Sequence, residues 1–172
     1  MTKIYTNLGS PTDAYNDLNG FDVAGPASSL GQSQFIALPF TPKANSHVTE
    51  IQAAVQYNNA GANQVRLSLY TDAAGVPGTI IAGPQTIKNL GIFGTCCTLT
   101  SWKLKAAVAV TAATQYWVVA DTPATGTGDD FFGVWDFVFT APLQAYNVNG
   151  GGWTDLNGFE ELPAGQVLGT VP

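Results

Sequence analysis

Runs of alternating apolar and polar residues recur along this chain, and segments rich in glycine or proline separate them. Within residues 48–57, apolar side chains occupy every second position at Ile51, Ala53, Val55 and Tyr57. Residues 65–70 repeat this period of two, which is typical of β-strands with one buried face. The intervening Asn58-Asn59-Ala60-Gly61 has the length and composition of a hairpin loop, so we expect the two segments to pair as antiparallel neighbours.

Further short segments have the composition of strands, and 19 glycines and 10 prolines punctuate them. They comprise residues 35–40, 79–81, 85–90, 99–104, 108–110, 116–120, 131–139, 145–148, 151–153 and 166–170. We predict one all-β domain over residues 1–172, an antiparallel jelly-roll-like β-sandwich of eight to ten strands without a long helix. Residues 1–34, rich in polar residues and glycine, are expected to form a loop-rich segment packed on it.

The charge balance excludes some partners. The net charge is −6 and only six residues are Lys or Arg, too few for a basic patch, so nucleic acid is not an expected partner. No apolar run has the length of a membrane-spanning helix. Only 10% of the residues are charged, and this low-charge, Asn/Thr/Gly-rich composition favours an extracellular or cell-surface location.

Two nearly identical segments lie at opposite ends of the chain. Their side-chain oxygen donors are Asp17, Asn19 and Asp22 in the first copy, and Asp155, Asn157 and Glu160 in the second. Alternating oxygen donors around a glycine are compatible with calcium, although each copy supplies about three of the six to eight ligands that calcium takes. The alternative is a tight turn in which Asn-Gly adopts a positive φ.

Cys96 and Cys97 are the only cysteines. In an oxidising compartment they would form a vicinal disulfide that stiffens the surrounding turn, whereas in a reducing one they would remain free thiols or soft metal ligands. The oxidised pair is the favoured hypothesis. Two thiols and the single histidine, His47, fall short of a structural zinc site.

Catalytic groups are scarce, and we do not expect an enzyme. His47 has no surrounding motif of a hydrolytic triad. The carboxylates on or near predicted strands are Glu50, Asp136, Glu160 and Glu161, and no two of them form a compelling glycosidase pair. A weak glycan hydrolase using Glu160 or Glu161 is therefore only the third hypothesis.

Aromatic residues carry the leading functional hypothesis. Trp153, in a glycine-rich segment, and Tyr70 are the aromatic residues expected to be presented outward, with Asp155 and Asn157 nearby to bond sugar hydroxyls. Packing of both rings in the core or a turn is the alternative. A second hypothesis is self-assembly into a fibre or layer, in which the N-terminal stretch and the aromatic strand 131–139 pair edges between subunits.

Several segments resemble the bacterial choice-of-anchor domains, particularly the type called R. They are Val65–Asp72 with Gly75–Gly78, Phe93–Cys97, Thr114–Ala120 and Leu162–Thr170. The resemblance implies a secreted, surface-associated β-sandwich without established enzyme activity, and it transfers no catalytic residues. Members of that family often continue into a Pro-Glu-Pro sorting motif and a membrane tail, whereas this sequence ends at Val171-Pro172.

Overall fold

Alternating side chains and frequent turns give this chain an all-β architecture. The structure is a computed structural model that describes residues 1–139, 145–155 and 161–172, and these ranges contain fourteen strands and no helix. The strands are β1 (Thr2–Thr6), β2 (Asn16–Ala24), β3 (Gln34–Phe40), β4 (Ser46–Ala53), β5 (Val55–Ala60), β6 (Gln64–Asp72), β7 (Pro77–Lys88), β8 (Thr100–Val110), β9 (Tyr116–Asp121), β10 (Phe132–Phe139), β11 (Ala145–Val148), β12 (Trp153–Asp155), β13 (Glu161–Pro163) and β14 (Gly165–Thr170).

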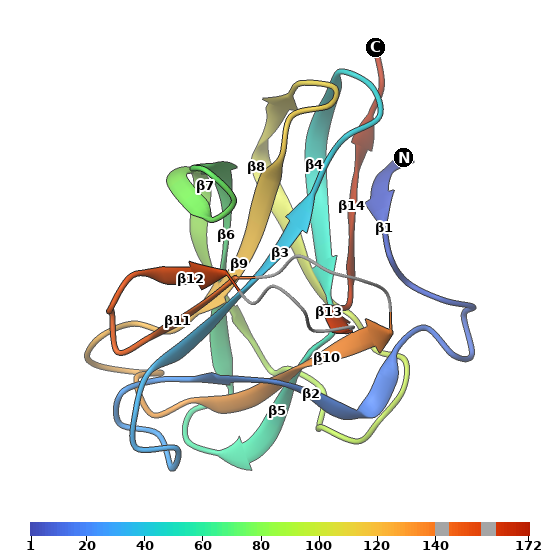
Figure 1. Ribbon diagram of the computed structural model, residues 1–172. Helices are drawn as coiled ribbons and strands as arrows, with labels where there is room; N and C mark the ends of the chain where they lie inside the picture. Colours follow the sequence, from blue (N-terminus) through green and yellow to red (C-terminus); the bar gives the residue numbers. More distant parts are fainter. Residues whose placement is uncertain (140–144, 156–160) are drawn as a thin grey trace.

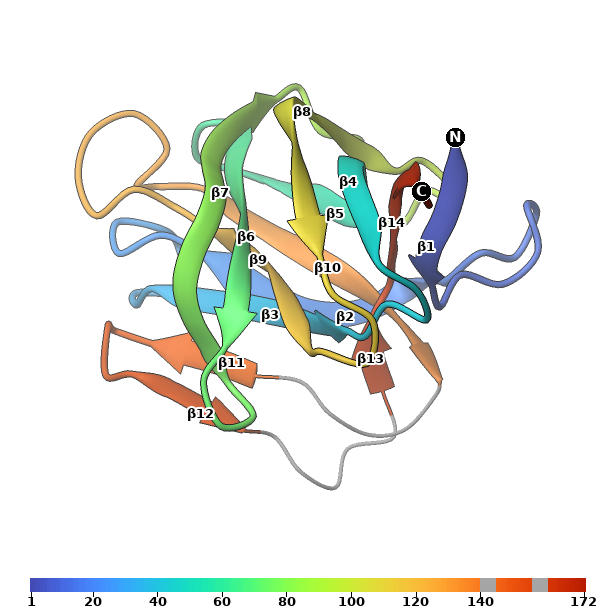
Figure 2. The same cartoon turned by 90° about the horizontal axis from the view of Figure 1, so that it is seen from above.

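The strands form two antiparallel sheets (Figures 1 and 2). The smaller sheet has the order β1-β14-β4-β8. The larger sheet runs β13-β10-β2-β3-β9-β6-β7, with β5 paired to β10 and the β11–β12 hairpin paired to β3. The predicted antiparallel β-sandwich is confirmed, with more strands than the eight to ten expected.

Apolar side chains between the sheets form the main core. The larger sheet contributes the fully buried Trp135, with Phe131 just before β10, and the smaller sheet contributes Ile51 and Trp102. The indole nitrogen of Trp135 donates a 2.8 Å hydrogen bond to the carbonyl oxygen of Ala164, so its polar atom is satisfied inside the core. No helix within the described ranges is long and apolar enough to span a membrane.

Two segments pass from one sheet to the other at a shared corner. The first changes sheets at Ala54, between β4 and β5, and the second at Ala164, between β13 and β14. Backbone hydrogen bonds of 2.8–3.0 Å link Ala54 and Ala164 to each other and both to Asp136 of β10. These bonds therefore attach both crossing segments to β10 of the larger sheet.

The corner corrects the predicted hairpin. Residues 48–57 are not one strand, and β5 pairs with β10 instead of β6. Strand β6 lies between β7 and β9. The alternation of Ile51, Ala53 and Val55 continues through the corner because all three side chains still face the common core.

The N-terminal 34 residues contain more regular structure than a loop-rich segment. Strand β1 pairs with β14, and β2 pairs with β10. Asp136 lies opposite Gly20 while the next residue, Phe137, lies opposite Asn16, so residues 17–19 bulge from β2. The expected turn at Asn19-Gly20 is wrong, because Gly20 is in a strand and neither residue has a positive φ.

The aromatic strand β10 has neighbours on both edges. Strands β5 and β13 pair along one edge and β2 along the other. Phe131 and Trp135 are fully buried, and Val134 on the opposite face is 4% exposed. Both faces are thus covered, and this strand has no free edge over its described pairing for the expected association between subunits.

Candidate functional site

A second apolar cluster lies on the face of the larger sheet that points away from the main core. Its buried members are Ala37 of β3 and Trp117 and Val119 of β9, each 0% exposed. Their neighbours along β9, Tyr116, Val118 and Ala120, face the main core instead. Strand β9 therefore buries both of its faces, which accounts for the continuous run of apolar residues from Tyr116 to Ala120. We call the surface formed by Ala37, Trp117 and Val119 the platform.

Tyr70 and Trp153 both pack against the platform and remain partly exposed. Tyr70 of β6 lies directly opposite Trp117 in the β6–β9 pair. Trp153 of β12 lies opposite Asn147 of β11, which in turn lies opposite Phe35 of β3. Because directly paired residues share a sheet face, the ladder brings Trp153 to the face that carries Tyr70.

Asp72 fixes the polar side of the platform. Its Oδ1 accepts hydrogen bonds of 2.8 Å from the indole nitrogen of Trp117 and from the side-chain amide of Gln115. Its Oδ2 accepts a 3.2 Å bond from the backbone N–H of Gly75. Burial alone would raise the pKa of Asp72, but the bonds from Trp117, Gly75 and Gln115 outweigh it and lower this pKa. The carboxylate therefore stays ionised and holds the Trp117 ring in place.

An ion pair lies farther along the same face. Arg66 of β6 donates to Asp121 of β9 at 2.6 Å, and its second guanidinium nitrogen donates to the carbonyl oxygen of Thr122 at 2.6 Å. Burial raises the pKa of Tyr70, the charge of Asp121 raises it further, and Arg66 opposes this shift. The Tyr70 phenol is therefore neutral at physiological pH and able to donate a hydrogen bond.

This arrangement bears directly on the predicted glycan-binding residues. Tyr70 and Trp153 come together on one face. Asp155 forms the end of β12, where its backbone pairs with Ala145 of β11. Asn157 lies outside the described residues. The sequence reasoning did not single out Asp72 or Arg66, although both have the same parity as Tyr70 along β6 and this alternation was the available signal.

The predicted calcium ligands of the first copy have other roles. Oδ2 of Asp17 accepts a 3.0 Å hydrogen bond from the N–H of Cys96, and the amide of Asn19 lies 3.5 Å from Oδ1 of Asn16. Asp22 lies within β2, opposite Val134. In the second copy, Asn157 and Glu160 fall outside the described ranges. Within those ranges no three His, Cys, Asp or Glu side chains gather into a metal-binding group.

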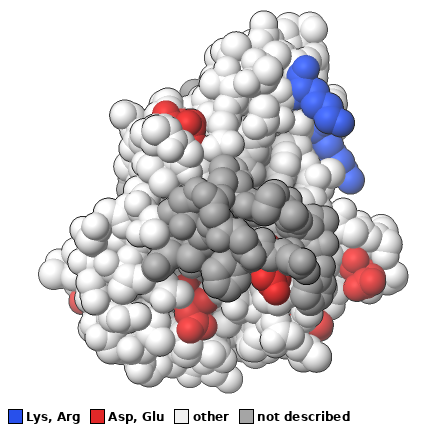
Figure 3. All heavy atoms as spheres, in the orientation of Figure 1, with Lys and Arg blue, Asp and Glu red and all other residues white. Residues whose placement is uncertain are grey.

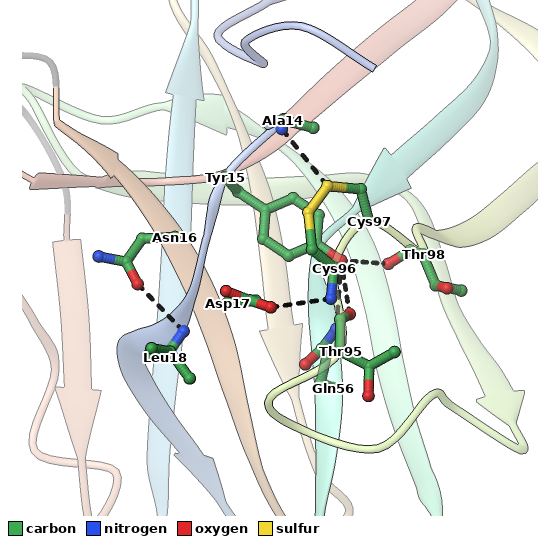
Figure 4. The surroundings of a disulfide bond; sticks show 10 residues. All are labelled: Ala14, Tyr15, Asn16, Asp17, Leu18, Gln56, Thr95, Cys96, Cys97 and Thr98. Carbon is green, nitrogen blue, oxygen red and sulfur yellow. Dashed lines mark hydrogen bonds between the residues drawn. A yellow bond between two sulfur atoms is a disulfide. The ribbon is translucent and has the colours of Figure 1, made fainter. Parts of the chain in front are cut away.

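Cys96 and Cys97 form a vicinal disulfide, and no cysteine is free (Figure 4). The N–H of Ala14 donates to Sγ of Cys97 at 3.4 Å, and the Tyr15 hydroxyl donates to the carbonyl oxygen of Thr98 at 2.9 Å. The side chain of Gln56 donates to the Tyr15 hydroxyl at 3.1 Å. These bonds, with the one from Cys96 to Asp17, attach the 89–99 loop to the start of β2.

The candidate carboxylates for hydrolysis do not assemble a described acid pair. Glu50, on the smaller sheet, is 5% exposed and accepts a 2.7 Å hydrogen bond from Ser101, whereas Asp136, on the larger sheet, is 0% exposed. Glu161 begins β13, and Glu160 lies outside the described residues. His47 is exposed on β4 and pairs through its backbone with β8 and β14.

Comparison with protein-family models, with curated proteins and with solved structures finds no match to this chain.

Proposed function

We propose that this chain is a non-catalytic extracellular or cell-surface recognition module that binds a glycan or surface polymer across the platform face. One observation carries the proposal. Tyr70 and Trp153, which come from strands on either side of the platform, pack on the same buried surface and both keep part of their rings exposed. Partly exposed aromatic rings on a rigid apolar base are suited to the CH faces of sugar rings.

The polar groups around the platform suit the same ligand. The phenol of Tyr70 supplies a donor, and Asp72, held by Trp117 and Gln115, supplies a fixed acceptor. Arg66 adds charged donors, although Asp121 and Thr122 already engage two of its nitrogens. Groups held in place before binding lose little conformational entropy when a ligand arrives.

Self-assembly is the alternative function, and a specific feature of the larger sheet favours it. Among the strands that the structure describes, β7 pairs only with β6, and its Ile80 and Ile81 are 43% and 36% exposed. An exposed strand edge with apolar side chains is a known route to association. Light scattering up to high protein concentration separates the two functions, because a binding module without self-association stays monomeric.

Substitution of the two rings tests the glycan proposal. Wild type, Trp153→Ala and Tyr70→Ala are compared by affinity electrophoresis in soluble neutral polysaccharides such as hydroxyethyl cellulose, xylan and galactomannan. We expect each substitution to weaken binding at least tenfold, about 1.4 kcal/mol, with little dependence on salt. Phe93→Ala is the matched control, since Phe93 is a partly buried aromatic of the 89–99 loop. That loop and the β11–β12 hairpin lie on opposite sides of the molecule in Figures 1 and 2.

Equal retardation of wild type and both platform variants in every polysaccharide would show that this face is not the binding site. Loss of binding in Phe93→Ala as well would point to general destabilisation, which circular dichroism of the same samples would reveal.

A further inference from the structure

A cavity of about 490 Å³ opens beside β1 and the end of β3. Its polar lining comes from Lys3, Tyr5, Thr6, Thr41, Lys43 and Gln115. Ile4, Pro39, Phe40 and Leu162 complete the wall, so the cavity combines an apolar surface with hydrogen-bonding groups. A cavity of this size and mixed lining accommodates a small ring-shaped ligand.

The charge of the cavity is opposite to that of the whole chain. Two of the six Lys and Arg residues line it, and none of the Asp and Glu residues that the structure describes does, although the chain carries a net charge of −6. Both lysines are exposed, and the one ion pair among the described residues joins Arg66 to Asp121 instead. In Figure 3, the basic side chains on the visible face gather into one stripe at the upper right, while the acidic ones lie apart from it.

The other polar groups can serve as neutral donors. Burial raises the pKa of Tyr5 to about 12, so its hydroxyl keeps its proton at physiological pH. Gln115 donates to Asp72, which also accepts hydrogen bonds from Trp117 and Gly75. Two described acidic residues adjoin the lining: Asp72 bonds to Gln115, and Glu161 directly precedes Leu162 in the chain.

The cavity is linked to the platform. Pro39, in its wall, lies directly opposite Trp117 in the β3–β9 pair. Gln115 and Trp117 share the same oxygen of Asp72. A ligand that extends across the platform therefore has a route to the lysines through adjoining residues.

We propose that this cavity binds the anionic group of an acidic sugar residue, so that the polymer recognised on the platform is a uronate- or sulfate-bearing polysaccharide. The inference rests on the proposed function for the polymer, but the cavity is testable alone. The lysine ammonium groups meet the anion, and the hydroxyls of Tyr5, Thr6 and Thr41 bond the sugar.

The experiment is a titration of ¹⁵N-labelled protein with trigalacturonate, a sulfated trisaccharide and neutral cellotriose, followed by NMR. We expect at least one acidic ligand to bind about tenfold more tightly than cellotriose and to shift the amides of residues 3–6 and 41–43. The double variant Lys3→Gln/Lys43→Gln should lose about tenfold in affinity for that ligand only. Raising the salt concentration should lower the affinity for the acidic ligand and leave the affinity for cellotriose unchanged.

The matched control is Lys88→Gln/Lys105→Gln, which removes the same charge from two exposed lysines outside this cavity. The proposal is overturned if neither acidic ligand binds more tightly than cellotriose, or if both double variants lose affinity equally. Trp153→Ala distinguishes the two proposals. If the platform does not bind the polymer but the cavity does bind the acidic sugar, Trp153→Ala and wild type give the same amide shifts at residues 3–6. If only the cavity proposal is wrong, the binding of neutral polysaccharides still depends on Trp153.

Discussion

At the scale of single residues, Asp136 has the most unusual environment among the described carboxylates. It is 0% exposed, and neither carboxylate oxygen has a hydrogen-bond partner among the described residues. Its backbone bonds to Ala54 and Ala164 place it at the corner where two segments change sheets. Burial, and then the negative charge of Asp17, raise the pKa of Asp136 to about 8.

A neutral Asp136 has a suitable acceptor on the neighbouring strand. Gln56 of β5 lies opposite Val134, two residues before Asp136, so both side chains belong to the same face. Oε1 of Gln56 is buried and has no partner in the described part of the chain. Burial, and then the charge of Asp136, raise the pKa of the Tyr15 hydroxyl to about 12. Asp136, Gln56 and Tyr15 therefore form a polar cluster that carries no charge when Asp136 is protonated.

This environment makes stability depend on pH. Between pH 4 and 8 folded Asp136 holds a proton that the unfolded chain releases, so its contribution to the free energy of unfolding falls by up to about 1.4 kcal/mol per pH unit as pH rises. Asp136→Asn keeps a neutral donor and removes this dependence. Urea unfolding should show the variant gaining stability relative to wild type from pH 5 to 8. Parallel pH profiles for the two proteins would contradict the raised pKa of Asp136.

At the scale of elements, β2 shows why a glycine in a strand is required for close approach. A Cβ on Gly20 would collide with the backbone oxygen of Trp135 and the side chain of Val134. The adjacent bulge at residues 17–19 is bound through Asp17 to the disulfide-containing loop. The strand thus contacts both the β10 backbone and the 89–99 loop.

Gly20→Ala should therefore separate β2 from β10 and lower the free energy of unfolding by about 2 kcal/mol or more. Chemical denaturation measures the loss. Gly91→Ala is the control, because Gly91 has no positive φ and the nearest atoms that an added Cβ would meet belong to Thr98, at 3.8 Å. If the two variants were equally stable, the close contact between β2 and β10 would not be the reason for glycine at position 20.

Elements also show how far the sequence predicts this molecule. The period of two locates β6 and the continuous apolar run locates β9, because both patterns report which side chains are buried. They do not report strand partners: Ile51, Ala53 and Val55 keep their parity while the chain moves from one sheet to the other. The meeting of Tyr70 with Trp153 likewise depends on the pairing of β3 with both β9 and β11, which no local pattern encodes.

At the scale of the whole molecule, the two ends of the chain close the smaller sheet together. Strand β1 pairs with β14 from Thr2 opposite Gly169 to Thr6 opposite Gln166, and Figure 1 shows the termini side by side. Ile4 is 8% exposed, and the ring of Tyr5 lies 6.0 Å from that of Phe40 of the larger sheet. Strand β1 thus covers the edge of β14, contributes to the core and forms one wall of the lysine-lined cavity.

Removal of residues 1–6 should therefore affect stability, association and binding together. Loss of the burial of Ile4 and Tyr5 removes about 3 kcal/mol, which corresponds to a fall in Tm of about 6–12 °C for a chain of this size. The exposed edge of β14 should also promote concentration-dependent association, measured by light scattering. Removal of Val171 and Pro172, which follow β14 and are exposed, is the control and should change neither property. An unchanged Tm after the N-terminal deletion would mean that β1 does not stabilise the sandwich, whereas a lower Tm without association would mean that the edge of β14 is protected by another segment.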